Sequence, residues 1–226
     1  TGPGDSVVDT SGFGAALNLV IDDTDPITWI EGGGLQIDTP VNILSVGAAG
    51  KLHDALTETG QMTLEAIFTP ENVSQNWARI VTCSDRNRRN FILAQNRDHY
   101  GFKLRTSRAG SSGGDTVASD DVLTEQTLQH VIVTYDGETI RVYRNGVLEI
   151  TESQEGDFDN WDSDYLLSFA NEVDRNKGWL GTLTRVAVYD RALSPFQVED
   201  LFRGDPPGDY DGEEDLSYSV RWIEQP

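Results

Sequence analysis

The stretch His130-Val-Ile-Val-Thr-Tyr-Asp-Gly137, followed by Val142-Tyr-Arg-Asn-Gly146, decides the fold. Its first segment is β-branched and aromatic, which favours a strand, and Asp136-Gly137 then turns the chain. A second pair, Asn145-Gly146, is the strongest short hairpin signal, because both central residues of that turn need a positive φ. The stretch therefore predicts a three-stranded antiparallel meander over residues 129–152, with its register set by its turns.

The same pattern continues outward in both directions. Short apolar segments recur between Gly, Asp and Asn clusters, which is typical of many strands joined by turns. This is more strands than one open sheet of a small domain usually contains. The chain is therefore expected to be all-β, with two antiparallel sheets packed face to face. The further strands are expected at residues 17–21, 35–38, 61–69, 77–83, 90–95, 100–106, 165–170 and 179–189.

Two short helices and an acidic end complete the expected organisation. The helices are predicted over residues 48–56 and over Pro195 to Phe202, the second behind the N-cap Ser194. Residues 1–204 are expected to form the sandwich. Residues 205–226 open with an Asp-, Pro- and Gly-rich stretch that buries too little apolar surface to fold alone, so they are interpreted as a tail or linker. Within it, residues 216–223 alternate like a strand that pairs with a sheet edge or begins a following domain.

Composition narrows the classes of partner. Seventeen basic residues against 38 acidic ones give a formal charge of -21, which repels nucleic acid and anionic bilayers. No apolar stretch approaches the ~18 residues of a spanning helix, so no membrane insertion is expected. Cys83 is the only cysteine and lies in the apolar run Ile80 to Cys83, where a small buried thiol packs well.

Three motifs resemble the laminin-G-like jelly-roll domains of the concanavalin A-like lectin/glucanase superfamily. The first is Met62-Thr-Leu-Glu-Ala-Ile-Phe-Thr-Pro70, and the second is the meander already described. The third, Gly181-Thr-Leu-Thr-Arg-Val-Ala-Val-Tyr-Asp-Arg-Ala-Leu-Ser194, is similar to the family's closing strand and helix start. The resemblance implies a two-sheet antiparallel jelly-roll sandwich with one or two short helices.

The same resemblance implies a noncatalytic recognition module that acts outside the cytoplasm, as a secreted, periplasmic or cell-surface protein. A carbohydrate ligand is the first expectation, and a structural or protein–protein interaction module is the alternative. A glycoside hydrolase or lyase of this fold is the third reading. The glucanase pattern E-x-D-x-x-E is incomplete here, because the segments that begin at Glu155 and Glu172 both lack the last acid. No catalytic residue is therefore assigned.

Candidate ligand-binding residues come from two loops. Trp161 lies among aspartates, where a large apolar ring either packs inward or stacks on a sugar. Arg86, Arg88 and Arg89 form the one basic cluster of an acidic chain, and guanidinium groups suit the carboxylates or sulfates of acidic polysaccharides. A solvated loop paired with nearby aspartates is the alternative for the arginines. Trp77 and Trp179 open strands and are expected in the core.

The resemblance also implies a structural Ca²⁺, held by aspartates and loop carbonyls. The densest acidic loop supplies Asp157, Asp159, Asp162 and Asp164, and residues 22–25 come next. Neither run has the spacing of an EF-hand loop, and surface acidity accounts for such runs as well.

Overall fold

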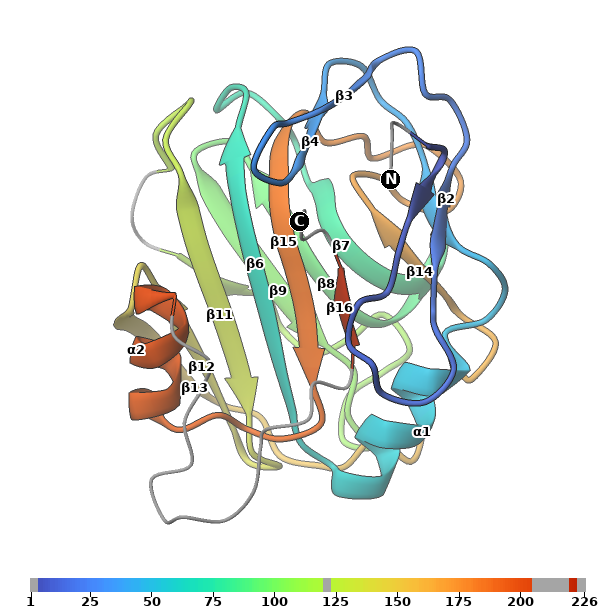
Figure 1. Cartoon of the computed structure of the whole chain (residues 1–226). Helices are drawn as coiled ribbons and strands as arrows, with labels where there is room; N and C mark the ends of the chain where they lie inside the picture. The colour runs from blue at the N-terminus through green and yellow to red at the C-terminus, as the bar shows by residue number, and fades with distance from the viewer. Residues whose placement is uncertain (1–3, 120–122, 205–219, 223–226) are drawn as a thin grey trace.

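The structure is a computed structural model that describes residues 4–119, 123–204 and 220–222. It contains two antiparallel β-sheets packed face to face, as Figure 1 shows. The fold is the jelly-roll sandwich that the motifs predict. Sheet A has the order β1 (Ser6–Val7), β2 (Leu19–Ile21), β5 (Ile43–Ser45), β14 (Leu166–Phe169), β7 (Ala78–Asp85), β8 (Arg88–Asn96), β9 (His99–Leu104) and β10 (Val117–Ala118).

Sheet B contains the meander. Its turn residues Asn145 and Gly146 have φ angles of 51° and 80°, so both adopt the left-handed conformation that the pair predicts. The sheet has the order β13 (Val147–Ser153), β12 (Thr139–Arg144), β11 (Gln129–Tyr135), β6 (Met62–Pro70), β15 (Gly181–Tyr189), β4 (Leu35–Ile37) and β3 (Ile27–Trp29), and β16 (Val220–Trp222) also pairs with β15.

The main core lies between the sheets, and the helices close the structure around it. Helix α1 (Gly50–Thr59) buries Leu52 and Leu56 in this core. Helix α2 (Pro195–Arg203) lies on the outer face of sheet B, beside β11 and β12 (Figure 1). It contributes to a second apolar cluster made of Ile132, Tyr143, Ala187, Tyr189, Leu193, Val198 and Leu201.

Four strands, β1, β3, β5 and β10, were not predicted from the sequence. Each has two or three residues, which is too short for a two-residue alternation to be visible. The predicted strand within residues 216–223 is present as β16 at Val220–Trp222, paired with β15. The other predictions for residues 205–226 lie outside the described residues.

Candidate binding site on the outer face of sheet A

The outer face of sheet A is formed by the side chains that alternate with the core residues. On β9, Tyr100 and Phe102 belong to the core, so Gly101 and Lys103 face outward. The register places Gly101 opposite Ala94 of β8 and Ala118 of β10. Small residues thus meet on this part of the outer face.

A cleft of 280 Å³ opens on this face, at the edge formed by β9 and β10. Trp77, just before β7, adopts a φ of 51°, a strained value for an aromatic residue, and its half-buried ring lies over Gly101. A Cβ built on Gly101 would lie 3.3 Å from that ring and 3.0 Å from the methyl group of Thr116, so any larger residue would press on both neighbours. The cleft is lined by Trp77, Asn96, His99, Tyr100, Gly101, Ala118 and Ser119.

Polar groups surround the ring. The imidazole Nε2 of His99 lies 3.2 Å from a carboxylate oxygen of Asp98, and its Nδ1 has no hydrogen-bond partner among the described residues although it is shielded from solvent. The hydroxyl oxygen of Ser119 accepts a hydrogen bond from the backbone N–H of Tyr100 at 3.2 Å. The cleft therefore combines an aromatic surface with a side chain that has spare hydrogen-bonding capacity.

A buried ion pair occupies the same outer face. The Nε of Arg79 donates to the Glu172 carboxylate at 3.0 Å, and the Ser84 hydroxyl donates to the other oxygen of Glu172. The carboxylate is 2% exposed, so its charge is fully engaged within the protein.

Arg89 lies beside this pair. Partial burial, and then the charge of Arg79, lower the pKa of Arg89, while the charge of Glu172 opposes them. One guanidinium nitrogen donates to the carbonyl of Asn87 at 3.2 Å, and the Nε is buried with no partner among the described residues. Arg89 is thus a cation without a carboxylate partner of its own.

The hairpin between β7 and β8 separates the three predicted arginines. Arg86 is at the turn with a φ of 53°, and Arg88 is opposite Asp85, and both are exposed. Arg89 is opposite Ser84, on the outer face. The structure therefore brings only Arg89 next to Arg79 and Glu172.

Trp161 belongs to the core, which corrects its assignment to a ligand surface. Its side chain is 6% exposed and stacks on Phe158 with a centroid separation of 4.3 Å. Its indole N–H donates to the carbonyl of Arg105 at 2.6 Å.

The two other tryptophans that were expected in the core differ from each other. Trp179 is buried as predicted, whereas Trp77 is half-buried and lines the cleft. Gly101 inside a strand was the available signal, because a strand glycine often marks a close approach.

The aspartate loop does not form a converging ligand set. Asp157 accepts the backbone N–H of Asp159, and Asp162 accepts that of Asp164, so two carboxylates close local turns. In the described part of the chain, no three His, Cys, Asp or Glu side chains lie close enough together to hold a metal ion. Calcium binding at this loop stays a prediction.

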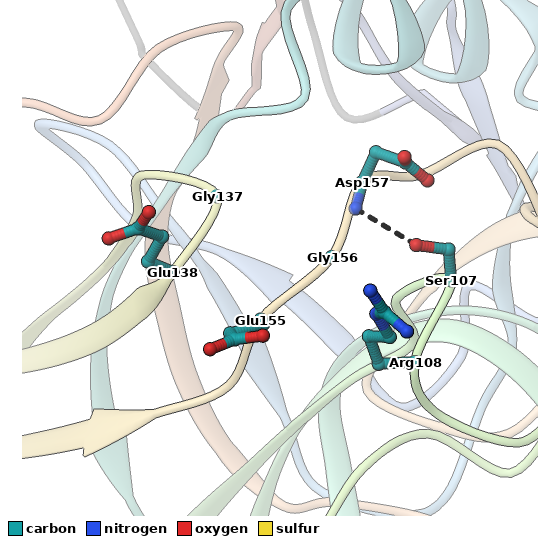
Figure 2. A pocket seen from close by; sticks show the side chains of 7 residues that line it. All are labelled: Ser107, Arg108, Gly137, Glu138, Glu155, Gly156 and Asp157. Atoms are coloured by element: carbon teal, nitrogen blue, oxygen red, sulfur yellow. Dashed lines mark hydrogen bonds between the residues drawn. The ribbon is translucent and has the colours of Figure 1, made fainter.

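Figure 2 shows a second hollow, of 440 Å³, at the end of the sandwich. Arg108 and Glu155 point into it, and Glu138 lies across the hollow from Arg108. Burial, followed by the charges of Asp136, Asp157, Glu138 and Glu155, raises the pKa of the adjacent Tyr135 to about 12. The hollow is polar and acidic, and no aromatic ring lines it.

The fold defines an all-β jelly-roll sandwich of the concanavalin A type. The model of the Concanavalin A-like lectin/glucanases superfamily matches residues 44–199, and the chain belongs to that family. A search of curated proteins found no match.

Solved structures share the fold. A heptameric SAP-like pentraxin from Limulus polyphemus superposes with a TM-score of 0.52 at 16% identity, over 74% of this chain and 83% of the pentraxin. The binding domain of botulinum neurotoxin serotype D/C VPI 5993 gives a TM-score of 0.64 at 12% identity. That match covers 88% of this chain and 51% of the toxin domain, so this chain spans about half of the toxin domain. Among the described residues no helix has the length and apolarity to cross a membrane.

Proposed function

We propose that this protein is a noncatalytic carbohydrate-recognition module that acts outside the cytoplasm and binds its ligand on the outer face of sheet A. The observation that carries the proposal is the Trp77 ring, which lies over Gly101 in a cleft of 280 Å³. Aromatic faces suit the apolar C–H surfaces of sugar rings, and a few polar groups fix the orientation of a small ligand.

The strained backbone of Trp77 supports this proposal. A positive φ is costly for a bulky residue and is retained where the surrounding structure requires it, often at a binding site. In this protein the strain carries the ring onto the solvent side of sheet A, above a residue without a side chain. A ring needed for the core alone would lie between the sheets, as Trp179 does.

Catalysis is not supported at Glu172, which begins one of the two incomplete glucanase patterns. Glu172 is buried and bonded to Arg79 and Ser84, so it is not free to reach a glycosidic bond. A glycoside hydrolase needs two accessible carboxylates on either side of that bond. Release of new reducing ends from a bound glycan would contradict the noncatalytic proposal.

The test is a glycan array with the full chain, followed by titration of each ligand found. Trp77→Ala should lose at least tenfold in affinity, because the stacking surface is removed. Trp29→Ala is the matched control, since Trp29 is also partly buried but lies on β3 of sheet B. Gly101→Ala keeps the Trp77 ring but adds a methyl group beneath it that displaces the ring. This variant should weaken binding severalfold in a folded protein. An array without ligands, or Trp77→Ala with unchanged affinity, would overturn the proposal.

A protein–protein interaction module is the second candidate. Val147 is 65% exposed at the start of β13 and Phe202 is 47% exposed on α2, and Phe202 would contact a Cβ at Gly146. Apolar side chains that gather on the surface are typical of protein interfaces. A partner whose binding is lost in Val147→Glu but retained in Trp77→Ala would favour this alternative.

A further inference from the structure

We infer that the glycan is acidic, and that Arg89 binds a sugar carboxylate on the outer face of sheet A while Trp77 stacks on a neighbouring part of the same chain. This inference rests on the proposed carbohydrate-binding function and names its ligand class.

The charge arrangement around Arg89 is the first argument. Two guanidinium groups, those of Arg79 and Arg89, lie near a single carboxylate, that of Glu172. Arg79 and Ser84 already occupy both oxygens of Glu172. Glu172 therefore does not neutralise the positive charge of Arg89, which is partly buried. An anionic ligand bound there would neutralise it.

The hydrogen-bonding capacity of Arg89 is the second argument. A guanidinium carries five N–H donors in a planar fork that matches a carboxylate with two parallel hydrogen bonds. One contact of Arg89, to the carbonyl of Asn87, is present, and the Nε is shielded from solvent without a partner in the described residues. Elsewhere on the molecule, Arg141, Arg175 and Arg203 each pair with a carboxylate. A ligand cannot reach the shielded Nε, but the terminal nitrogens of Arg89, unlike those of these residues, form no ion pair within the described residues.

The position of Arg89 relative to Trp77 is the third argument. Ala94, in register with Gly101, is five residues from Arg89 along β8. A register shift between Phe91 and Arg89 brings Arg89 onto the same face, so the two ends of the site are about 15 Å apart. Ile92 lies between them and is 1% exposed, so a ligand would contact the protein at the two ends of the site and not along a continuous groove. This span fits an extended oligosaccharide better than a single sugar.

The net charge of -21 repels polyanions at long range, so the contact has to be local. At 0.5 M salt, repulsion between exposed charges is screened within a few ångströms, whereas a partly buried pair is screened much less. Binding assays should therefore be made at this salt concentration.

The experiment compares two ligands that differ only in charge: oligomers of polygalacturonate and the same oligomers as full methyl esters. The full chain should bind the acid at least tenfold more tightly than the ester. Arg89→Gln should remove this preference, with the larger loss of affinity for the acid, whereas Arg89→Lys, which keeps the charge but not the fork, should retain part of it. Arg203→Gln is the matched control, because it removes the same charge from α2 on the opposite sheet.

Each outcome separates the inference from the proposed function. Equal affinity for acid and ester, or an unchanged preference in Arg89→Gln, would overturn the acidic-glycan inference while the carbohydrate site stands. Preference for dextran sulfate over polygalacturonate would overturn the assignment of a carboxylate. Loss of ester binding in Trp77→Ala supports the carbohydrate site independently of charge. An absence of binding to any glycan would overturn both.

Discussion

The outer faces of the two sheets both contain a buried glutamate, but they differ in how that glutamate is covered. On sheet B, Glu65 is fully buried beneath the region where α2 packs, and it contacts His130 at 3.0 Å, Tyr189 at 2.8 Å and Arg185 at 3.3 Å. His130 in turn packs against Phe202 of α2, with ring centroids 6.0 Å apart. All three of these side chains are directed at Glu65.

On sheet A, no helix of the described residues covers the corresponding face, and the network around Glu172 is incomplete. Arg79 and Ser84 bind its carboxylate, while Arg89 keeps an unused donor and Trp77 keeps a half-exposed ring. A charged network that is satisfied and covered contributes to stability. One that is left open, with spare donors, is suited to recognition.

The largest effect is expected from Glu65→Gln, because it leaves Arg185 and His130 without a buried anion. Removing one partner of a buried ion pair costs about 3 kcal/mol or more. The free energy of unfolding, from urea titration, should fall by about that amount while glycan affinity is unchanged in the folded protein. Glu199→Gln, in an exposed pair with Arg203, should cost less than about 0.5 kcal/mol. A loss below about 1 kcal/mol for Glu65→Gln would contradict the stabilising role of this face.

Glu172→Gln tests the opposite face and should cost less, about 2 kcal/mol, because two side chains bind the Glu172 carboxylate whereas three bind that of Glu65. The substitution removes the negative charge between Arg79 and Arg89. We expect tighter binding of an acidic glycan as stability falls, measured by calorimetric titration beside thermal unfolding. Weaker binding would show that Glu172 contacts the ligand or holds the site in shape.

A change of pH should separate the faces further. Burial alone would raise the pKa of Glu65, but the hydrogen bond from His130, the charges of Arg185 and His130 and the hydrogen bond from Tyr189 together lower it. A carboxyl group with a lowered pKa in the folded state stabilises the fold above its unfolded pKa, about 4.3, and that contribution is lost as pH falls further. Stability measured from pH 7 to 3 should therefore decline below about pH 4.5, and Glu65→Gln should decline less steeply. Parallel curves would rule out Glu65 as a source of the decline.

Local signals predicted the architecture because they require few distant contacts. Asn145-Gly146 needs only its own dihedral angles, and the cap of α2 needs only Ser194 and Gln197. These features lie within a few residues of one another, so the sequence shows them directly. The short strands β3 and β10 depend on pairing with β4 and β9, and that pairing is not visible in three residues or fewer.

The site was harder to predict because the direction of a side chain depends on distant partners. Trp161 lies between aspartates but turns inward, since Arg105 accepts its N–H and Phe158 stacks on it. Trp77 precedes an apolar strand but turns outward, because Gly101, 24 positions along the chain, leaves room for its ring. The flanking residues of each tryptophan suggest the opposite placement. For Trp77, the outward placement follows from the register between β7, β8 and β9.

The smallest effect is expected at the helix that covers sheet B. Ser194 accepts the N–H of Gln197 at 3.3 Å, and Gln197 accepts the N–H of Ser194 at 2.9 Å, so the start of α2 is fixed by a capping box. Ser194→Ala should cost about 1 kcal/mol, measured by urea unfolding, while Ser111→Ala in an exposed loop should change stability by less than about 0.5 kcal/mol. Because α2 shields the Glu65 network and has no counterpart on sheet A in the part of the chain that the structure describes, hydrogen exchange should increase at β11 and β15 in Ser194→Ala but not at β8 and β9. Equal increases in both sheets would mean that the helix stabilises the domain as a whole, and the contrast between a covered and an open face would lose its physical basis.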